Sequence, residues 1–254
     1  MSRHTIAILN QKGGVGKTTT TINLAAFLAR SGRSVLVCDL DPQGNTTSGL
    51  GVDKQTLDST LYDVLFSRAD ASKTIKEVSS HGIFLLASNA QLAGAEVELV
   101  SSQSREYKLR QVLEKLDYDY ILIDCPPSLG LLTVNALTAA NEVLIPVQAE
   151  YYAMEGLSQL LSVIGQVKQS LNPQLNILGI LITLYDRRTA LSEQVKKELE
   201  KHFEAKVLQT VIPRNIRLAE APSFGKTIIE HDKWSKGARA YKSLAKEVDQ
   251  RLYG

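Results

Sequence analysis

The chain has 254 residues, of which 44% are hydrophobic and 22% charged, and its formal net charge is +2 at pH 7. These values are ordinary for a soluble globular protein, and the length is enough for one full α/β domain with a buried sheet. No apolar run approaches the roughly 20 residues that span a bilayer, and the N-terminus lacks the apolar core of a signal peptide. We therefore expect a cytoplasmic protein with a single domain over residues 1–254.

Apolar runs alternate with helical patterns along the chain, which is typical of an α/β fold with a mostly parallel, twisted sheet covered on both faces. Most runs are rich in Val, Ile and Leu and predict buried strands over residues 4–9, 34–38, 83–87, 120–124, 142–147, 177–184 and 206–212. Helical spacing and end signals predict helices over residues 18–31, 104–116, 131–139, 155–171, 191–203 and 236–252. Segments 42–60 and 87–103 have the least regular patterns.

The first predicted strand is followed directly by the run KGGVGKTT. Its three glycines let the backbone curl so that successive N–H groups point at a polyphosphate, and the following helix directs its positive end at the same anion. Lys17 then supplies a charge at the β- and γ-phosphates, and Thr18 a hydroxyl for Mg²⁺. The run predicts a phosphate-binding loop, as in P-loop nucleotide hydrolases, formed by Lys12, Gly13, Gly14, Val15, Gly16, Lys17, Thr18 and Thr19.

The loop departs from the usual G-x-x-x-x-G-K-[ST] pattern, because Gln11 occupies the position of the first glycine. A second lysine, Lys12, stands at the head of the loop. This KGGxGKT form is known from one branch of nucleotide hydrolases. The alternative is a loop whose glycines only make a turn, with Lys12 as a solvated side chain.

The second predicted strand ends in DLDPQGN, which places Asp39 and Asp41 at the carboxyl edge of the sheet, beside the loop. Phosphoryl transfer to water needs a residue that orients the attacking water, and Asp41 is our candidate. Asp39 is nearer the strand and is expected to support Asp41 or the outer ligands of Mg²⁺. Two aspartates that only cap a turn remain the alternative.

A second acidic position ends the strand YILID, at Asp124. A carboxylate at this place holds Mg²⁺ directly or through water, because Mg²⁺ loses its water ligands reluctantly. The stiff loop that follows, with Pro126 and Pro127, is able to change position when the γ-phosphate leaves, as switch loops do. An acid that merely terminates a strand is the alternative.

Two further observations concern partners. Cys38 and Cys125 each lie near the end of a strand-like run without a neighbouring Cys or His at metal spacing, so we expect buried thiols rather than a disulfide or a shared iron–sulfur cluster. Residues 185–254 carry 15 Lys and Arg against 10 Asp and Glu, which makes this part the basic one. Charge alone favours a solvated helical surface, and a polyanion-binding face needs specific arginines.

Together, the runs NQKGGVGKTTT, DLDPQGN, QLAGAEVELV, YILIDCPPSLGLLTVNAL, PVQAEYYAMEGLSQLL and VIPRNIRLAEAPSFGK closely resemble the ParA/Soj family of chromosome- and plasmid-partitioning ATPases. The resemblance extends over nearly the whole chain. It implies a slow ATP hydrolase that forms an ATP-dependent sandwich dimer, in which Lys12 reaches the partner's phosphates and Gly13 lies close to the facing subunit. ATP and Mg²⁺ are the implied cofactors, and Lys12, Lys17 and Asp41 the implied catalytic residues.

The resemblance also implies contacts outside the loop. Pro213 and Asn215 match the adenine-contacting pair, and Arg188 and Arg217 match arginines that hold double-stranded DNA without sequence preference. Arg187 replaces the usual small residue, so the assignment between Arg187 and Arg188 stays open. A ParB/Spo0J-like protein is expected to stimulate hydrolysis, and the family implies a nucleoid-associated protein with no membrane contact.

Two other functions compete with this interpretation. A membrane-associated positioning ATPase resembling MinD binds lipid through a C-terminal amphipathic helix, and here the last predicted helix carries apolar residues at helical spacing. That stripe is expected to pack in the core instead. A metal-cluster carrier or reductase is the third possibility, since nitrogenase iron-protein relatives carry the same loop.

Overall fold

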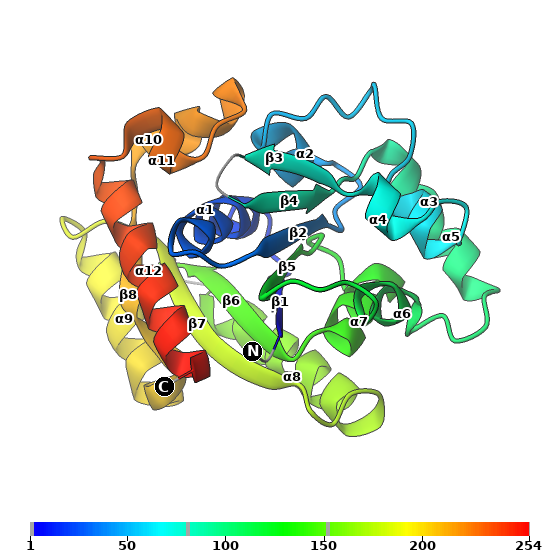
Figure 1. Ribbon diagram of the computed structural model, residues 1–254. Helices are drawn as coiled ribbons and strands as arrows, with labels where there is room; N and C mark the ends of the chain where they lie inside the picture. Colours follow the sequence, from blue (N-terminus) through cyan, green and yellow to red (C-terminus); the bar gives the residue numbers. More distant parts are fainter. Residues whose placement is uncertain (1–2, 80–81, 151–152, 254) are drawn as a thin grey trace.

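The computed structural model describes residues 3–79, 82–150 and 153–253. One sheet of eight strands runs through these residues in the order β3-β4-β2-β5-β1-β6-β7-β8 (Figure 1). All neighbouring strands are parallel except β3, which pairs antiparallel with β4 at one edge. The strands are β1 His4–Ile8, β2 Val35–Asp39, β3 Lys76–Ser79, β4 Ile83–Leu86, β5 Tyr120–Asp124, β6 Glu142–Gln148, β7 Asn176–Tyr185 and β8 Val207–Pro213.

Helices cover the sheet on both faces (Figure 1). The α-helices are α1 Lys17–Arg30, α2 Asn45–Gly49, α3 Leu61–Leu65, α4 Ala71–Thr74, α5 Ala93–Val100, α6 Lys108–Leu113, α7 Leu131–Ala139, α8 Ala153–Ser170, α9 Ala190–Phe203, α10 Ile216–Glu220, α11 Ile228–Asp232 and α12 Lys236–Tyr253. Three short 3₁₀ turns are η1 Ala90–Leu92, η2 Glu204–Lys206 and η3 Ala221–Phe224. Apolar side chains of α1, α10, α11 and α12 pack on one face, and those of α3 and α5 to α9 on the other.

The central strand β1 shows why the strands are continuous apolar runs. Ile6 and Ile8 point into the core shared with α1 and α12, whereas Ala7 and Leu9 point into the core on the opposite face. All four side chains are fully buried. Because successive strand residues alternate between faces and both faces are covered, every position of the strand favours an apolar residue.

The seven predicted strands and six predicted helices are confirmed, with differences at their ends and a shorter α6. The segments with the least regular patterns, 42–60 and 87–103, contain the unpredicted helices α2 and α5. α2 is a short run of small and polar residues without apolar spacing, and on α5 Val97 and Val100 are 77% and 61% exposed. β3 was missed because it is a four-residue edge strand whose Lys76 and Glu77 are exposed.

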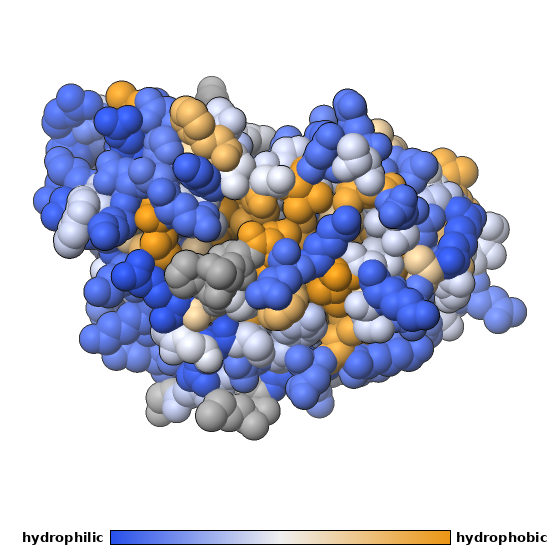
Figure 2. All heavy atoms as spheres, turned by 45° about the horizontal axis from the view of Figure 1, so that its top comes forward, coloured by the Kyte–Doolittle hydropathy of each residue, from blue (hydrophilic) through white to orange (hydrophobic). Residues whose placement is uncertain are grey.

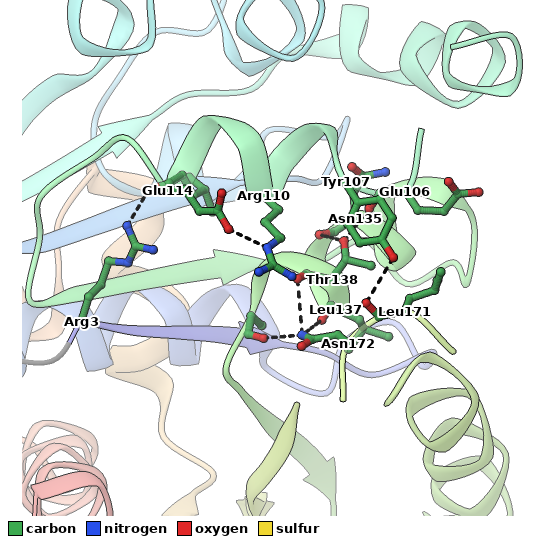
Figure 3. A network of polar contacts seen from close by, with 12 residues as sticks. Arg3, Glu106, Tyr107, Arg110, Glu114, Asn135, Leu137, Thr138, Leu171 and Asn172 are labelled. Carbon is green, nitrogen blue, oxygen red and sulfur yellow. Dashed lines mark hydrogen bonds and ion pairs between the residues drawn. The ribbon is translucent and has the colours of Figure 1, made fainter. Parts of the chain in front are cut away.

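Buried amides tie α7 to the segments beside it. Asn172 donates to the carbonyl oxygens of Leu137 (2.8 Å) and Ala140 (2.7 Å) at the end of α7. Asn135 accepts from the backbone N–H of Leu109 at 3.1 Å and thereby ties α7 to α6. Figure 3 shows these amides between the helices. The network therefore ties α7 to α6 and to the turn after α8.

Candidate functional site

The loop between β1 and α1 has the backbone shape that phosphate binding requires. Gly14 and Gly16 adopt φ of +75° and +89°, which side-chain-bearing residues resist. The carbonyl oxygen of Val15 accepts from the hydroxyl of Thr183 at 2.8 Å, and Asn10 donates to the carbonyl of Pro146 at 2.7 Å. Contacts from β6 and β7 therefore hold the loop in place before any ligand is considered.

The two lysines of the loop lie in opposite environments. Lys17, at the start of α1, is 8% exposed, and its Nζ donates to the carbonyl oxygen of Lys12 at 3.1 Å. Burial lowers the pKa of Lys17, and the carboxylate of Asp124 acts against this shift. The side chain of Lys12 is 53% exposed and forms an ion pair with Glu150 of its own chain. One lysine thus points into the loop and the other lies at the surface.

Asp124 lies at the carboxyl end of β5, in register with Ile8 of β1, and its side chain is fully buried. Its Oδ2 accepts from the hydroxyls of Thr18 (2.7 Å) and Thr46 (2.6 Å). Burial raises the pKa of Asp124, whereas these two hydrogen bonds lower it. A carboxylate bonded to a loop threonine and backed by a buried lysine is the arrangement expected beside Mg²⁺ and a polyphosphate.

The two aspartates of the second strand have different tasks. Asp39 is fully buried and accepts from the backbone N–H and hydroxyl of Thr47 at 2.8 and 2.7 Å. Burial raises its pKa, and the nearby Asp124 adds to the shift. Asp41 lies further out, 8% exposed, and its backbone N–H donates to Asp39 at 3.3 Å. Asp39 therefore holds both the backbone of Asp41 and the start of α2, and its role beside Mg²⁺ stays a prediction.

Several residues of this site were not predicted. Thr46 and Thr47 bind Asp124 and Asp39, and their place directly after DLDPQGN was the available signal. Glu96 of α5 accepts from the backbone N–H groups of Leu131 (2.9 Å) and Leu132 (3.3 Å) at the start of α7. A Cβ at Gly130 would contact the carboxylate of Glu96, so a larger residue there requires this side chain to shift. No local pattern pairs Glu96 with a helix 35 residues later.

The donor set fits Mg²⁺ better than a cysteine-bound cluster. In the described ranges, no three His, Cys, Asp or Glu side chains gather closely enough to hold a metal ion by themselves. Cys38 and Cys125 are free, fully buried thiols, and burial raises the pKa of both. Mg²⁺ takes one or two carboxylates and completes its shell with phosphates and water, which Thr18 and Asp124 beside the loop allow.

The two residues expected at adenine lie at the same edge of the sheet. Pro213 ends β8, where it is in register with Tyr185 of β7. Asn215 caps α10, because its side-chain oxygen accepts from the backbone N–H of Leu218 at 3.2 Å. The carboxyl ends of β1, β7 and β8 therefore bring these two residues to the side of the sheet on which the loop lies.

The arginines expected at DNA are exposed and separate into two places. Arg188 pairs with Asp186 at 2.7 Å while its side chain is 86% exposed, and it lines a groove together with Arg187. Arg217, on α10, is 56% exposed, pairs with Glu220 at 2.9 Å and lies outside the lining of that groove. Most of the face in Figure 2 is hydrophilic, and apolar side chains gather near its middle.

A mostly parallel sheet with a glycine-rich loop between its central strand and the next helix, and with a buried acid on the adjacent strand, defines a P-loop nucleotide hydrolase. The AAA domain family matches residues 3–177. The sporulation initiation inhibitor protein Soj of Bacillus subtilis is 56% identical over 96% of this chain and 97% of its own length. The chromosome partitioning protein ParA of Caulobacter vibrioides is 50% identical over 97% and 94%.

Solved structures agree with this class. A crystal structure named cobyrinic acid a,c-diamide synthase from Mycobacterium smegmatis, with bound ADP and magnesium, has a TM-score of 0.85 at 42% identity. The match covers 96% of this chain and 93% of that one. The chain belongs to the Soj/ParA family of chromosome-partitioning ATPases.

Proposed function

We propose that this ATPase is a nucleotide-dependent switch for partitioning a chromosome or plasmid. In the ATP state it forms a sandwich dimer that binds double-stranded DNA without sequence preference. Hydrolysis, slow alone and stimulated by a ParB/Spo0J-like protein, releases it. The observation that carries the proposal is the difference in exposure between the two loop lysines. Lys17 is buried in its own loop, whereas Lys12 is exposed at the surface.

The chemistry follows from the positions of the side chains within one ATPase domain. The backbone of residues 12–19 and Lys17 hold the phosphates of ATP, while Pro213 and Asn215 contact the adenine. Thr18 and Asp124 hold Mg²⁺, which neutralises charge on the phosphates when bound. Asp41, fixed by its backbone bond to Asp39, orients the attacking water. In this family of reactions the protein mainly positions groups and stabilises charge.

The exposed side of the loop supports a dimer. Beyond its chain neighbours, a Cβ added to Gly13 would meet no atom of the described residues within 4 Å, so no described contact inside the subunit accounts for glycine there. Close approach of a second subunit gives a reason for the small residue. Lys12 needs only to leave Glu150, an ion pair between partly exposed groups, to reach the partner's phosphates.

DNA binding rests on Arg188 and Arg217, with Arg187 as the alternative to Arg188. Arginine grips phosphate through two parallel hydrogen bonds, and such contacts carry no direct base information. A dimer presents each arginine twice, so the ATP-dependent assembly of two weak surfaces is enough to switch DNA binding. The protein is then expected in the cytoplasm, associated with the nucleoid.

The test is DNA binding measured with ATP, with ADP and without nucleotide, on two duplexes of unrelated sequence. We expect binding with ATP only, equal on both duplexes, together with an ATP-dependent dimer in light scattering. A ParB/Spo0J-like protein added to the DNA-bound form should raise the rate of hydrolysis. Equal binding in all three nucleotide states would contradict the switch, and strong preference for one duplex would contradict phosphate recognition.

The membrane-associated alternative receives little support from α12. Its apolar stripe is buried, with Ala238, Tyr241, Leu244 and Val248 at most 1% exposed. A helix whose apolar side packs in the core has no such side left for lipid. None of the helices in the described part of the chain has the length and apolar character that crossing a bilayer needs. Sedimentation with anionic vesicles tests this alternative directly.

A further inference from the structure

A groove of about 650 Å³ lies where the loop after β7, the end of β8 and the start of α12 meet. Its lining contains five basic side chains and one acidic side chain, and the remaining residues are mostly apolar. The charged members are Asp186, Arg187, Arg188, Arg214, Lys236 and Arg239. These residues come from three separate parts of the chain, so the charge of the groove is not visible as a run in the sequence.

The charges in the groove are not balanced. Asp186 is bound by Arg188 through two hydrogen bonds, of 3.0 and 2.7 Å, and this contact with Arg188 holds the pKa of Asp186 well below its usual range. The other four cations are Arg187, Arg214, Lys236 and Arg239. Across the described residues, none of these four has a carboxylate within 4.0 Å. Like charges held together repel each other, so the groove is complementary to an anion with several charges.

Rigid elements hold the unpaired cations in place. Lys236 and Arg239 are three residues apart on α12, so they project from the same side of that helix. The helix is anchored by the buried Tyr241 and Leu244. The backbone N–H of Arg214 donates to the carbonyl of Tyr185 at 3.0 Å, which fixes it directly after β8. The cations are therefore presented at set positions, as repeated contacts to a regular polyanion require.

The occupant that fits this arrangement is the sugar–phosphate backbone of duplex DNA. The cations are exposed along the groove, and a DNA strand supplies a phosphate at each nucleotide for several of them. The apolar part of the lining, with Val211 and Ala240, suits the sugar between phosphates. Arg217 differs, since it lies outside the lining and is already paired with Glu220 and Asp232.

We propose that Arg214, Lys236 and Arg239 bind phosphates of duplex DNA in this groove beside Arg188, an inference that rests on the proposed DNA-binding function. The groove is also lined by Pro213, the residue proposed at adenine. Pro213 and Arg214 are adjacent in the chain. The base of the nucleotide and the DNA backbone are thus contacted by neighbouring residues at the end of β8.

The salt dependence of DNA affinity tests the groove, measured by fluorescence anisotropy with a non-hydrolysable ATP analogue. If Arg188 and Arg217 were the only contacts, the dimer would neutralise about four phosphates and log affinity would fall with log salt at a slope of about −3.6. With Arg214, Lys236 and Arg239 added, we expect a slope approaching about −9. Lys236→Gln or Arg239→Gln should each make the slope shallower by about 1.8 and lower affinity about 60-fold at 0.1 M salt.

Matched controls are Lys115→Gln and Arg110→Gln, exposed cations near α6 on the opposite face of the sheet, which should retain the parental slope. Arg239→Lys should keep most of the slope, which separates lost charge from lost folding. Unchanged slope and affinity in both groove variants, with DNA binding intact in the parent, would overturn the inference. The inference would also be overturned if the groove variants lost binding to phosphatidylglycerol vesicles or to inorganic phosphate but bound DNA as the parent does. Failure of the parent protein to bind DNA would instead overturn the proposed function.

Discussion

The nucleotide site and the basic groove lie at the same end of the sheet but are built differently. In the nucleotide site Asp124 is fully buried and hydrogen-bonded to two threonine hydroxyls, and Lys17 is 8% exposed. In the groove, the paired Arg188 is 86% exposed at its side chain, and four other cations lack a carboxylate within 4.0 Å in the described residues. Matched buried groups select one ligand by geometry, whereas exposed unpaired charges attract any polyphosphate backbone.

The largest effect is expected in the nucleotide site, at Asp41. Asp41→Ala should lower turnover by about 10²- to 10⁴-fold, because it removes the group that orients water while leaving the phosphate loop intact. ATP binding and dimerisation should persist, and the protein should stay on DNA. Phosphate release and DNA retention measure the two effects. Asp58→Ala, at an exposed position of the same segment, is the control, and undiminished hydrolysis in Asp41→Ala would remove Asp41 from its proposed role.

The same comparison predicts that the exposed arginines act on DNA alone. Arg217→Glu should lower DNA affinity by more than about 60-fold at 0.1 M salt, because each subunit loses one phosphate contact and gains repulsion. It also leaves Glu220 and Asp232 without their cation. Arg188→Glu should have a weaker effect of the same kind. Both variants should dimerise normally with ATP, and normal DNA binding by Arg217→Glu would refute this surface.

Lys17 sharpens the contrast, because it is the one cation of the pair that is buried in the loop. Lys17→Ala should weaken ATP binding by about 10- to 100-fold, as expected when a hydrogen bond to a charged group is removed. Equilibrium titration with a fluorescent ATP analogue measures this loss. DNA binding should fail only as a consequence of lost nucleotide, so a saturating ATP concentration should restore it. If affinity for ATP is unchanged, Lys17 does not contact the phosphates.

Gly13 tests whether the exposed side of the loop is an interface. A branched residue in Gly13→Val fits inside its own subunit but would obstruct a facing one, so the dimer should weaken by about tenfold or more. The folded monomer should still bind ATP. Gly165→Val, at an exposed glycine of α8 with no atom near an added Cβ, should dimerise normally. An unchanged ATP-dependent dimer in light scattering would rule out the facing-loop geometry.

The smallest effect is expected at His4, outside both regions. Its ring packs edge-on against Tyr253 at 4.8 Å, and burial lowers the pKa of His4 below its ordinary value of 6.5. Below pH 6.5 the unfolded chain therefore takes up a proton that the folded chain resists, and stability falls as the pH decreases. His4→Gln should flatten this part of the pH profile, with thermal midpoints differing by about 2 °C or less. Identical profiles of stability against pH in the parent and in His4→Gln would contradict this effect of His4.

The sequence predicted what depends on neighbours along the chain. The central strands were predicted because burial on two faces leaves a continuous apolar run. Lys17, Asp41 and Asp124 were proposed as site residues because a loop or acid follows such a run. It did not predict contacts between distant segments. The bond from Thr46 to Asp124 spans 78 residues, and the cap of α7 by Glu96 spans 35.

The same distinction separates the predicted arginines from the groove. Arg188 and Arg217 were proposed through motifs, whereas their ion pairs with Asp186 and Glu220 depend on side-chain geometry that no motif predicts. The grouping of Arg214 with Lys236 and Arg239 follows from the meeting of β8 and α12. Composition indicated only that residues 185–254 are basic, and net charge does not distinguish a solvated surface from a groove.

The central place of β1 has a consequence for the ribosome-bound chain. β1 is made before its partners β5 and β6, which end at Asp124 and Gln148, so it stays unpaired until those later strands have been synthesised. The hydroxyl that holds Val15 comes from Thr183, 168 residues later. At about 5–20 residues per second, that interval is about 8–34 s. The phosphate loop is thus made well before the strand that completes it, and a nascent chain gains its full nucleotide site only after β7 has been made.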